Sequence, residues 1–200
     1  MKNFFLLFLI VFSSACAQDK QQLVGETEWQ KQMNTDFKDA SKSPLKKKDL
    51  KKFKGLDFYK FDSTYVVNAK LKRILNSEWF EMKTTTNRVS KERIFGILSF
   101  QLKGISYNLN VYQSEELMST QEYKDYLFLP FLDDTNGEGS YAGGRYIDLR
   151  IPEGDTIEID FNKAYNPYCA YNENYSCPIV PRENYLATTI EAGVKAFNKY

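Results

Sequence analysis

An alternation of apolar and polar side chains with a period of two constrains the fold of this chain more than any other feature of its sequence. It occupies residues 65–72 and returns in 80–84 and 98–111, where Lys103-Gly104 is typical of a tight hairpin turn. A period of two is the repeat of a strand that buries one face, whereas a helix repeats every ~3.6 residues. The central part of the chain is therefore predicted to form antiparallel hairpins.

Further strands are predicted in the second half of the chain. The apolar run 127–132 is typical of a buried strand, and Pro130 within it favours an edge position or a bulge. Segments 140–150, 156–161 and 186–190 are also predicted as strands. The fifteen phenylalanines and fourteen tyrosines favour the same structure. We expect a mainly β domain of about eight antiparallel strands, arranged as a barrel-like sheet or a sandwich.

The N-terminus has the pattern of an export signal. Lys2 precedes an apolar run at 4–12 that is too short to anchor in a bilayer, and small residues follow it. The sequence therefore predicts three parts, a signal peptide at 1–15, a flexible tether at 16–27 and a single β-rich domain at 28–200. Trp29, Met33 and Phe37 recur at helical spacing, so the domain is expected to begin with a helix over 28–40.

The residues around Cys16 fit two ways of processing the signal peptide. Ser14-Ala15-Cys16 resembles a bacterial lipobox, in which Cys16 is lipidated and the protein is periplasmic or anchored to the outer membrane. Ala15-Cys16-Ala17 also fits cleavage by ordinary signal peptidase, which leaves a secreted soluble protein. No second apolar span follows, so we expect contact with a membrane only through a lipid on Cys16.

Composition argues against several classes of function. The 27 basic side chains include Lys2 of the signal peptide, so the mature chain balances its 26 acidic side chains and has no electrostatic reason to bind nucleic acid. The chain has no histidine, which excludes Ser–His–Asp and Cys–His nucleophiles and histidine-bearing metal sites. We expect neither a metal nor a cofactor.

The segment 162–184 is long and irregular for a loop, and it is dense in Tyr, Asn and Pro. It contains Cys169 and Cys177, which form an even pair once Cys16 is set aside, and an exported protein meets an oxidising compartment. We therefore predict a disulfide that stabilises the fold by roughly 2.5 kcal/mol. A redox or metal role is the alternative, although the spacing is not C-x-x-C.

Arginine, carboxylate and amide side chains supply the remaining candidate chemistry. Arg145 shares a strand face with Ile147 and Leu149, so if that face is the core its guanidinium points inward and needs a carboxylate partner. This set forms either a structural network that fixes the long loop or a ligand pocket in which tyrosines stack on the ligand. The candidate ligand-binding residues are Arg145, Asp148, Asp160, Asn162, Tyr165, Asn166, Tyr168, Tyr171, Glu183 and Asn184.

Several short motifs together resemble one family. They are Ser43-Pro44-Leu45, Phe53-Lys54-Gly55-Leu56, residues 109–113, residues 128–131 with Asp134, residues 143–149, and the segment 160–195 with Glu191-Ala192-Gly193 near its end. On these motifs, residues 28–197 resemble the bacterial family catalogued as domain of unknown function 1684. The resemblance implies no activity, ligand or mechanism. Members often carry Glu after the Ala-Gly pair, where this chain has Val194.

Three functions fit the sequence. The first is a non-enzymatic exported domain that binds a small molecule, a glycan or an envelope partner through the tyrosine-rich loop and the region of Arg145. The second is a hydrolase or lyase with paired carboxylates, for example Glu138 or Glu183 with Asp148. The third is a structural envelope lipoprotein. We favour the binding domain and leave enzymatic activity open.

Overall fold

The computed structural model describes residues 25–198. The predicted signal peptide, Cys16 and most of the tether lie outside the described residues. Within 25–198 no helix has the length and apolar character to cross a membrane. The short helices are α1 (Glu28–Lys38), α2 (Lys47–Leu50), α3 (Glu115–Met118) and the 3₁₀ turns η1 (Ser63–Tyr65), η2 (Phe161–Lys163), η3 (Tyr168–Ala170) and η4 (Arg182–Asn184). The strands are β1 (Val66–Arg73), β2 (Trp79–Lys83), β3 (Val89–Leu102), β4 (Ile105–Ser114), β5 (Tyr126–Asp133), β6 (Arg145–Arg150), β7 (Thr156–Asp160) and β8 (Tyr185–Leu186).

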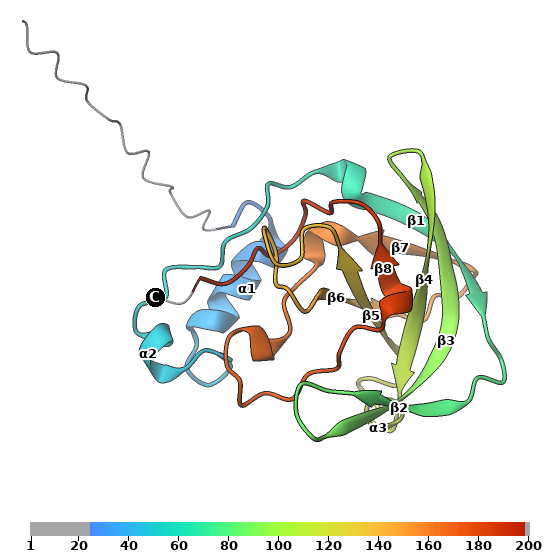
Figure 1. Ribbon diagram of the computed structural model, residues 1–200, viewed down its shortest axis with the longest axis horizontal. Helices are drawn as coiled ribbons and strands as arrows, with labels where there is room; N and C mark the ends of the chain where they lie inside the picture. The colour runs from blue at the N-terminus through green and yellow to red at the C-terminus, as the bar shows by residue number, and fades with distance from the viewer. Residues whose placement is uncertain (1–24, 199–200) are drawn as a thin grey trace, which may run out of the picture.

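One curled sheet forms the body of the protein (Figure 1). Its strand order is β6-β5-β4-β3-β1-β7, with β2 added to β3 and β8 added to β5. The pairings are antiparallel except β5–β8, which is parallel. The mainly β fold of eight strands is confirmed. Because the strands curl as a single half-barrel, the sandwich alternative is not the arrangement that this chain adopts.

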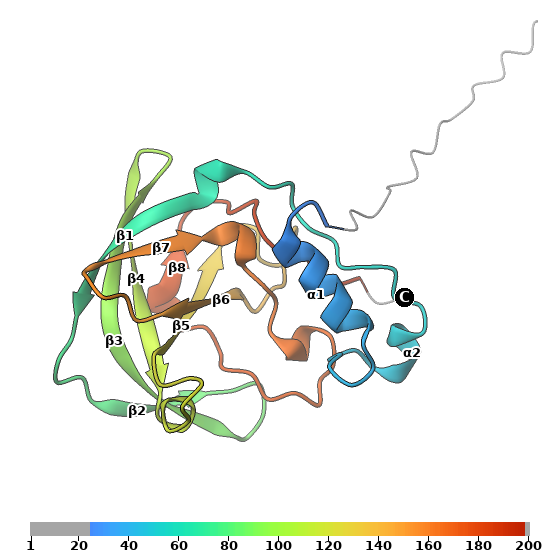
Figure 2. The same ribbon diagram turned by 180° about the vertical axis from the view of Figure 1, so that it is seen from behind.

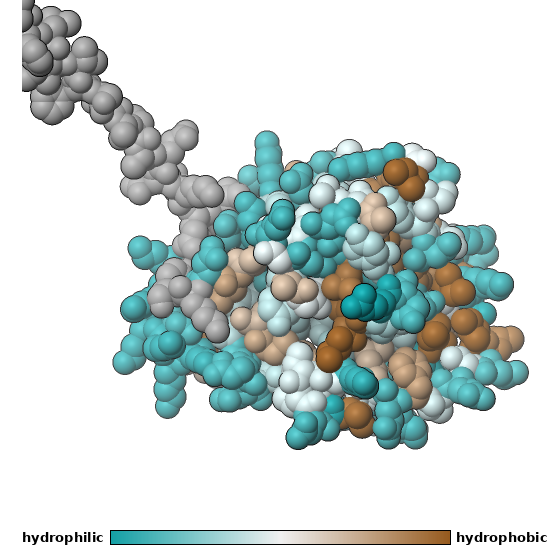
Figure 3. All heavy atoms as spheres, viewed as in Figure 1, coloured by the Kyte–Doolittle hydropathy of each residue, from teal (hydrophilic) through white to brown (hydrophobic). Residues whose placement is uncertain are grey.

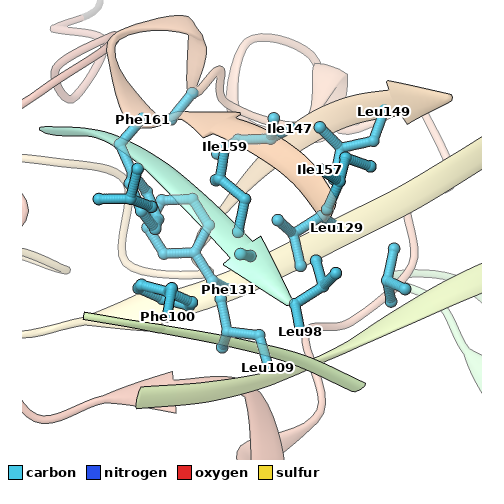
Figure 4. Packing of buried hydrophobic residues seen from close by; sticks show 14 of the residues in the cluster. Leu98, Phe100, Leu109, Leu129, Phe131, Ile147, Leu149, Ile157, Ile159 and Phe161 are labelled. Carbon is cyan, nitrogen blue, oxygen red and sulfur yellow. The ribbon is translucent and has the colours of Figure 1, made fainter. Parts of the chain in front are cut away.

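The main core lies on the concave face of the sheet, where the alternating apolar residues of neighbouring strands meet (Figure 4). Leu98 of β3 is paired with Leu109 of β4, and Leu129 of β5 with Ile147 of β6. These side chains are almost completely buried. The hairpin between β3 and β4 turns at Lys103 and Gly104, both with positive φ, as two-residue turns between twisted strands require.

The helix α1 and the segment after β7 lie side by side at one end of the sheet (Figures 1 and 2). A capping box of Thr27 and Gln30 begins α1 at Glu28, inside the segment in which a helix was expected. Phe37 of α1 packs edge-on against Tyr171, with ring centroids 4.8 Å apart. This end of the surface is mainly hydrophilic around α2, and apolar patches lie over the strands (Figure 3).

Pro130 lies in an interior strand, because β5 has β4 on one side and β6 on the other. The edge position predicted for it is wrong, and the side chain of Asn184 shows why proline is tolerated. The Asn184 amide donates to the carbonyls of Pro130 at 2.7 Å and Asn110 at 2.8 Å, and its Oδ1 accepts from the Asn110 N–H at 2.9 Å. Asn184 therefore bridges β4 and β5 where a proline cannot donate.

The buried pair Arg145–Asp133 connects β6 and β5 to the C-terminal segment. Both side chains are fully buried, and Arg145 Nη2 lies 3.0 Å from Asp133 Oδ1. The guanidinium also donates to the carbonyl oxygens of Ile190, at 2.8 Å, and Ala192. Burial lowers the pKa of Arg145, and the Asp133 carboxylate opposes that shift. The expectation that Arg145 points inward to a carboxylate is confirmed, with Asp133 as the partner.

We predict that Arg145→Ala lowers the free energy of unfolding by about 3–5 kcal/mol, because it leaves the Asp133 carboxylate buried without its counter-charge. Urea denaturation measures this change. Lys70→Ala is the control, since it removes an ion pair to Asp155 in which both side chains are about two-thirds exposed, and it is expected to cost less than ~1 kcal/mol. Similar losses in the two variants would contradict the prediction.

Candidate functional site

A cavity rich in aromatic side chains, here called the tyrosine pocket, lies between α1, β6 and the C-terminal loop. It has a volume of about 700 Å³. Trp29 and Met33 of α1 form one wall and β6 forms another, while the loop contributes Tyr168 and Tyr175. Tyr168 and Tyr175 pack edge-on with ring centroids 5.2 Å apart. The pocket therefore offers aromatic surface on several sides.

Asp148 of β6 supplies the polar wall of the tyrosine pocket. It lies opposite Phe128 on the face of the sheet that does not contribute to the main core. Its Oδ1 accepts hydrogen bonds from the hydroxyls of Tyr126, at 2.7 Å, and Tyr165, at 2.5 Å. Burial, together with the nearby Asp148 charge, raises the pKa values of both tyrosines, so they remain neutral donors.

Tyr165 reaches this position because the chain after β7 runs along β6. The backbones of Tyr146 and Tyr165 exchange two hydrogen bonds, at 2.9 and 3.0 Å, and their rings are edge-on at 5.9 Å. The Tyr146 hydroxyl donates to the carbonyl of Pro178, farther along the same loop. These contacts fix the loop against the edge strand β6, and they hold Tyr146, Tyr165 and Pro178 in the lining of the tyrosine pocket.

A second cavity of about 460 Å³ adjoins the first, and the two share Tyr146, Tyr165 and Pro178 as lining. We call it the Glu92 pocket, because the buried Glu92 of β3 lines it. Burial raises the pKa of Glu92, an effect that outweighs the hydrogen bonds from Ser90 and Ser114 and the charge of Arg88.

A β-bulge puts Glu92 on this face. Glu92 pairs with Ser114, whereas beyond the bulge between Ile94 and Gly96 the strand pairs Leu98 with Leu109 in the main core. The extra residue reverses which positions of β3 face each side. No strand was predicted over 89–97, and an uninterrupted period of two would have placed Glu92 on the core side with Leu98, so sequence reasoning missed it.

Cys169 and Cys177 are both free thiols. The predicted disulfide is therefore not confirmed: the two side chains are joined by a hydrogen bond, and the Cys169 backbone N–H donates to Cys177 Sγ at 3.2 Å. The hydrogen bond from Cys177 lowers the pKa of Cys169 to about 6, and the same contact raises the pKa of Cys177. Cys177 lines the tyrosine pocket.

Of the predicted ligand-binding residues, Asp148, Tyr165 and Tyr168 line the tyrosine pocket. The others do not line either pocket. Arg145 and Asn184 serve the structural contacts described above, and Glu183 is exposed on η4. The remaining four have structural contacts, in which Asp160 caps η2, Asn162 bonds the backbone of Asp62, Asn166 donates to the carbonyl of Lys195, and Tyr171 packs on Phe37.

Several lining residues were not predicted as site residues. Trp29 and Met33 of α1 were assigned only to a helix, and their spacing gives no sign that one face of that helix covers a cavity. Tyr126 and Tyr146 alternate with core residues in their strands, so their period-two positions do carry a signal. They share a face with Asp148, the predicted strand carboxylate that does line the tyrosine pocket.

Comparisons with known proteins agree with the motifs. A family model described as protein of unknown function (DUF1684) matches residues 51–195. The solution NMR structure of an uncharacterised protein from Haloarcula marismortui is similar, with 32% sequence identity and a TM-score of 0.65 over 83% of this chain and 89% of that chain. No curated protein matches the chain.

We predict that iodoacetamide alkylates Cys169 of the reduced protein with a pH–rate midpoint near the pKa of about 6. Mass spectrometry of quenched samples measures the rate. Cys177→Ala should move the midpoint toward the ordinary cysteine value of about 8.5, because it removes the hydrogen bond that stabilises the Cys169 thiolate. An unchanged midpoint in the variant would show that Cys177 does not control the thiol.

Proposed function

This chain belongs to the DUF1684 family, and we propose that it is a binding module for a small molecule or glycan that enters the tyrosine pocket. The observation that carries the proposal is the pocket itself. Its volume of about 700 Å³ falls within the range of small-molecule sites, and it combines aromatic walls with few polar groups, as such sites do.

The lining supports recognition of a ligand with a flat apolar face and hydroxyl groups. Tyr168 lines the pocket and is 44% exposed, so part of its ring remains available for stacking. Asp148 is exposed at the same wall and is held in place by two tyrosine hydroxyls. A carboxylate fixed in this way is a suitable acceptor for ligand hydroxyl or N–H groups.

The carboxylate pairs considered for a hydrolase receive less support. Glu138 lines a different cavity, together with Thr135 and Lys195, and Glu183 lies exposed on η4. Neither of them lines a pocket with Asp148 among the described residues. Binding is therefore the function that the geometry favours over carboxylate catalysis by these pairs.

We also propose that the protein is exported and tethered by a lipid on Cys16, on the strength of the sequence alone. Export takes the protein to an oxidising compartment, which favours a disulfide in the mature protein. Cys169 and Cys177 are suited to form it, because their thiols are already hydrogen-bond partners. A thiol oxidant of the exported compartment would accept the two electrons, and the two thiol protons would leave as the S–S bond forms. The bond would then join η3 to the segment that lines the pocket.

The disulfide is tested on protein purified from the cell envelope without reductant. Non-reducing peptide mass spectrometry is expected to find Cys169 and Cys177 in one cross-linked peptide, and reduction should separate it. The same protein produced in a reducing cytoplasm is the control and should give two free thiols. Free thiols in envelope-derived protein would contradict the proposal.

The binding function is tested by a thermal-shift screen of small molecules and oligosaccharides, in which a ligand of the folded state raises the melting temperature. For any hit, Tyr168→Ala should weaken binding about tenfold because a stacking ring is lost. Tyr185→Ala is the matched control, since Tyr185 is 50% exposed and lines neither pocket. Equal affinities in the two variants would place the ligand elsewhere.

A further inference from the structure

The carboxyl group of Glu92 has an unmatched polar atom at the wall of the Glu92 pocket. The residue is 2% exposed, and its Oε1 accepts a hydrogen bond from the Ser90 hydroxyl at 2.7 Å. Its Oε2 is also buried and makes no hydrogen bond of good geometry within residues 25–198, although the neighbouring Ser114 hydroxyl helps to lower the pKa of the carboxyl. Buried carboxylate oxygens normally accept a hydrogen bond. A bound group that donates to Oε2 would complete the hydrogen bonding of this carboxyl.

Aromatic rings form much of the remaining wall. Tyr126, Phe128, Tyr146 and Tyr165 line the same pocket as Glu92. Phe128 and Tyr146 are edge-on with ring centroids 4.7 Å apart, which fixes their relative orientation. Ring faces attract cations, and the attraction is stronger where water is excluded.

The charge around the pocket is biased toward acid. Glu116 of α3 lines it with Glu92, and Arg88 is the one basic side chain in the lining. Arg88 is already engaged by the C-terminal loop, because its guanidinium donates to the Ser176 hydroxyl at 3.2 Å and to the Ser176 carbonyl at 3.1 Å. Its guanidinium therefore faces the loop and forms no ion pair with Glu92 among the described residues, although its charge still lowers the pKa of the Glu92 carboxyl.

We propose that the Glu92 pocket binds the protonated amine of the ligand, an inference that rests on the proposed binding function and narrows its ligand class to organic ammonium compounds. The ammonium donates to Glu92 Oε2, and the aromatic rings surround its alkyl part. Shared lining by Tyr146, Tyr165 and Pro178 puts the amine next to the tyrosine pocket. An anionic ligand is disfavoured by Glu92 and Glu116.

The test compares two probes of nearly equal shape, protonated phenethylamine and neutral 2-phenylethanol, by isothermal titration calorimetry on the wild-type protein. Phenethylamine is expected to bind about tenfold more tightly, because only it carries the charge that Glu92 and the rings recognise. N-acetylphenethylamine removes the charge from the ligand and should bind as weakly as the alcohol. These arms need no variant and so do not depend on refolding.

Glu92→Gln identifies the residue responsible. It keeps the shape of the side chain and should weaken phenethylamine about tenfold without changing the affinity for 2-phenylethanol. Glu116→Gln is the control, because this exposed rim carboxylate is screened by water and should change the affinity less than about threefold. Circular dichroism melting checks that both variants are folded.

Three results would overturn the inference. They are equal affinity of the wild type for phenethylamine and 2-phenylethanol, unchanged affinity of folded Glu92→Gln for phenethylamine, and no binding of either probe at millimolar concentration. A hit from the small-molecule screen that depends on Tyr168 would leave the proposed binding function standing in each case. If the screen finds no ligand and neither probe binds, both the proposed binding function and the inference about the Glu92 pocket are rejected.

Discussion

The Arg145 guanidinium is fully withdrawn from water, and its charge can remain there only if the surrounding groups compensate it. Asp133 and two C-terminal carbonyl oxygens do so, and Asp133 in turn accepts the Ile190 N–H at 2.8 Å. The C-terminal segment is thereby fixed beneath the sheet. Because the loop that precedes it also carries the lining of the tyrosine pocket, the geometry of the candidate site depends on this buried pair.

The two faces of the strands have different roles, because one packs in the core and the other lines the pockets. In β6, Arg145, Ile147 and Leu149 face the main core, while Tyr146 and Asp148 face the pockets. Neighbouring strands continue the second face, so carboxyl and tyrosine side chains from β3, β5 and β6 line adjoining cavities. A single sheet thus supplies a packed core on one side and a polar aromatic wall on the other, and the C-terminal loop encloses that wall.

The aromatic walls and the acid groups have complementary roles in the proposed binding. Tyrosine hydroxyls hold Asp148 in place, and burial keeps those hydroxyls neutral. Glu92 instead retains an oxygen that makes no hydrogen bond of good geometry among the described residues, in a pocket with Phe128 and Tyr146. Protein donors therefore fix the Asp148 carboxylate before a ligand binds, whereas in the proposed binding the Glu92 carboxyl takes a donor from the ligand.

The sequence by itself determined the mainly β fold, the β3–β4 hairpin, the family and the strand face that Arg145 shares with Ile147 and Leu149, because each follows from local alternation, turn chemistry or a contiguous motif. Which distant residues contact one another was decided by the tertiary structure alone. Asp133 neutralises Arg145, Asn184 compensates for Pro130, and a bulge brings Glu92 to the pocket. Such outcomes depend on contacts between distant segments and on a one-residue shift of strand register, and neither leaves a periodic signal along the chain.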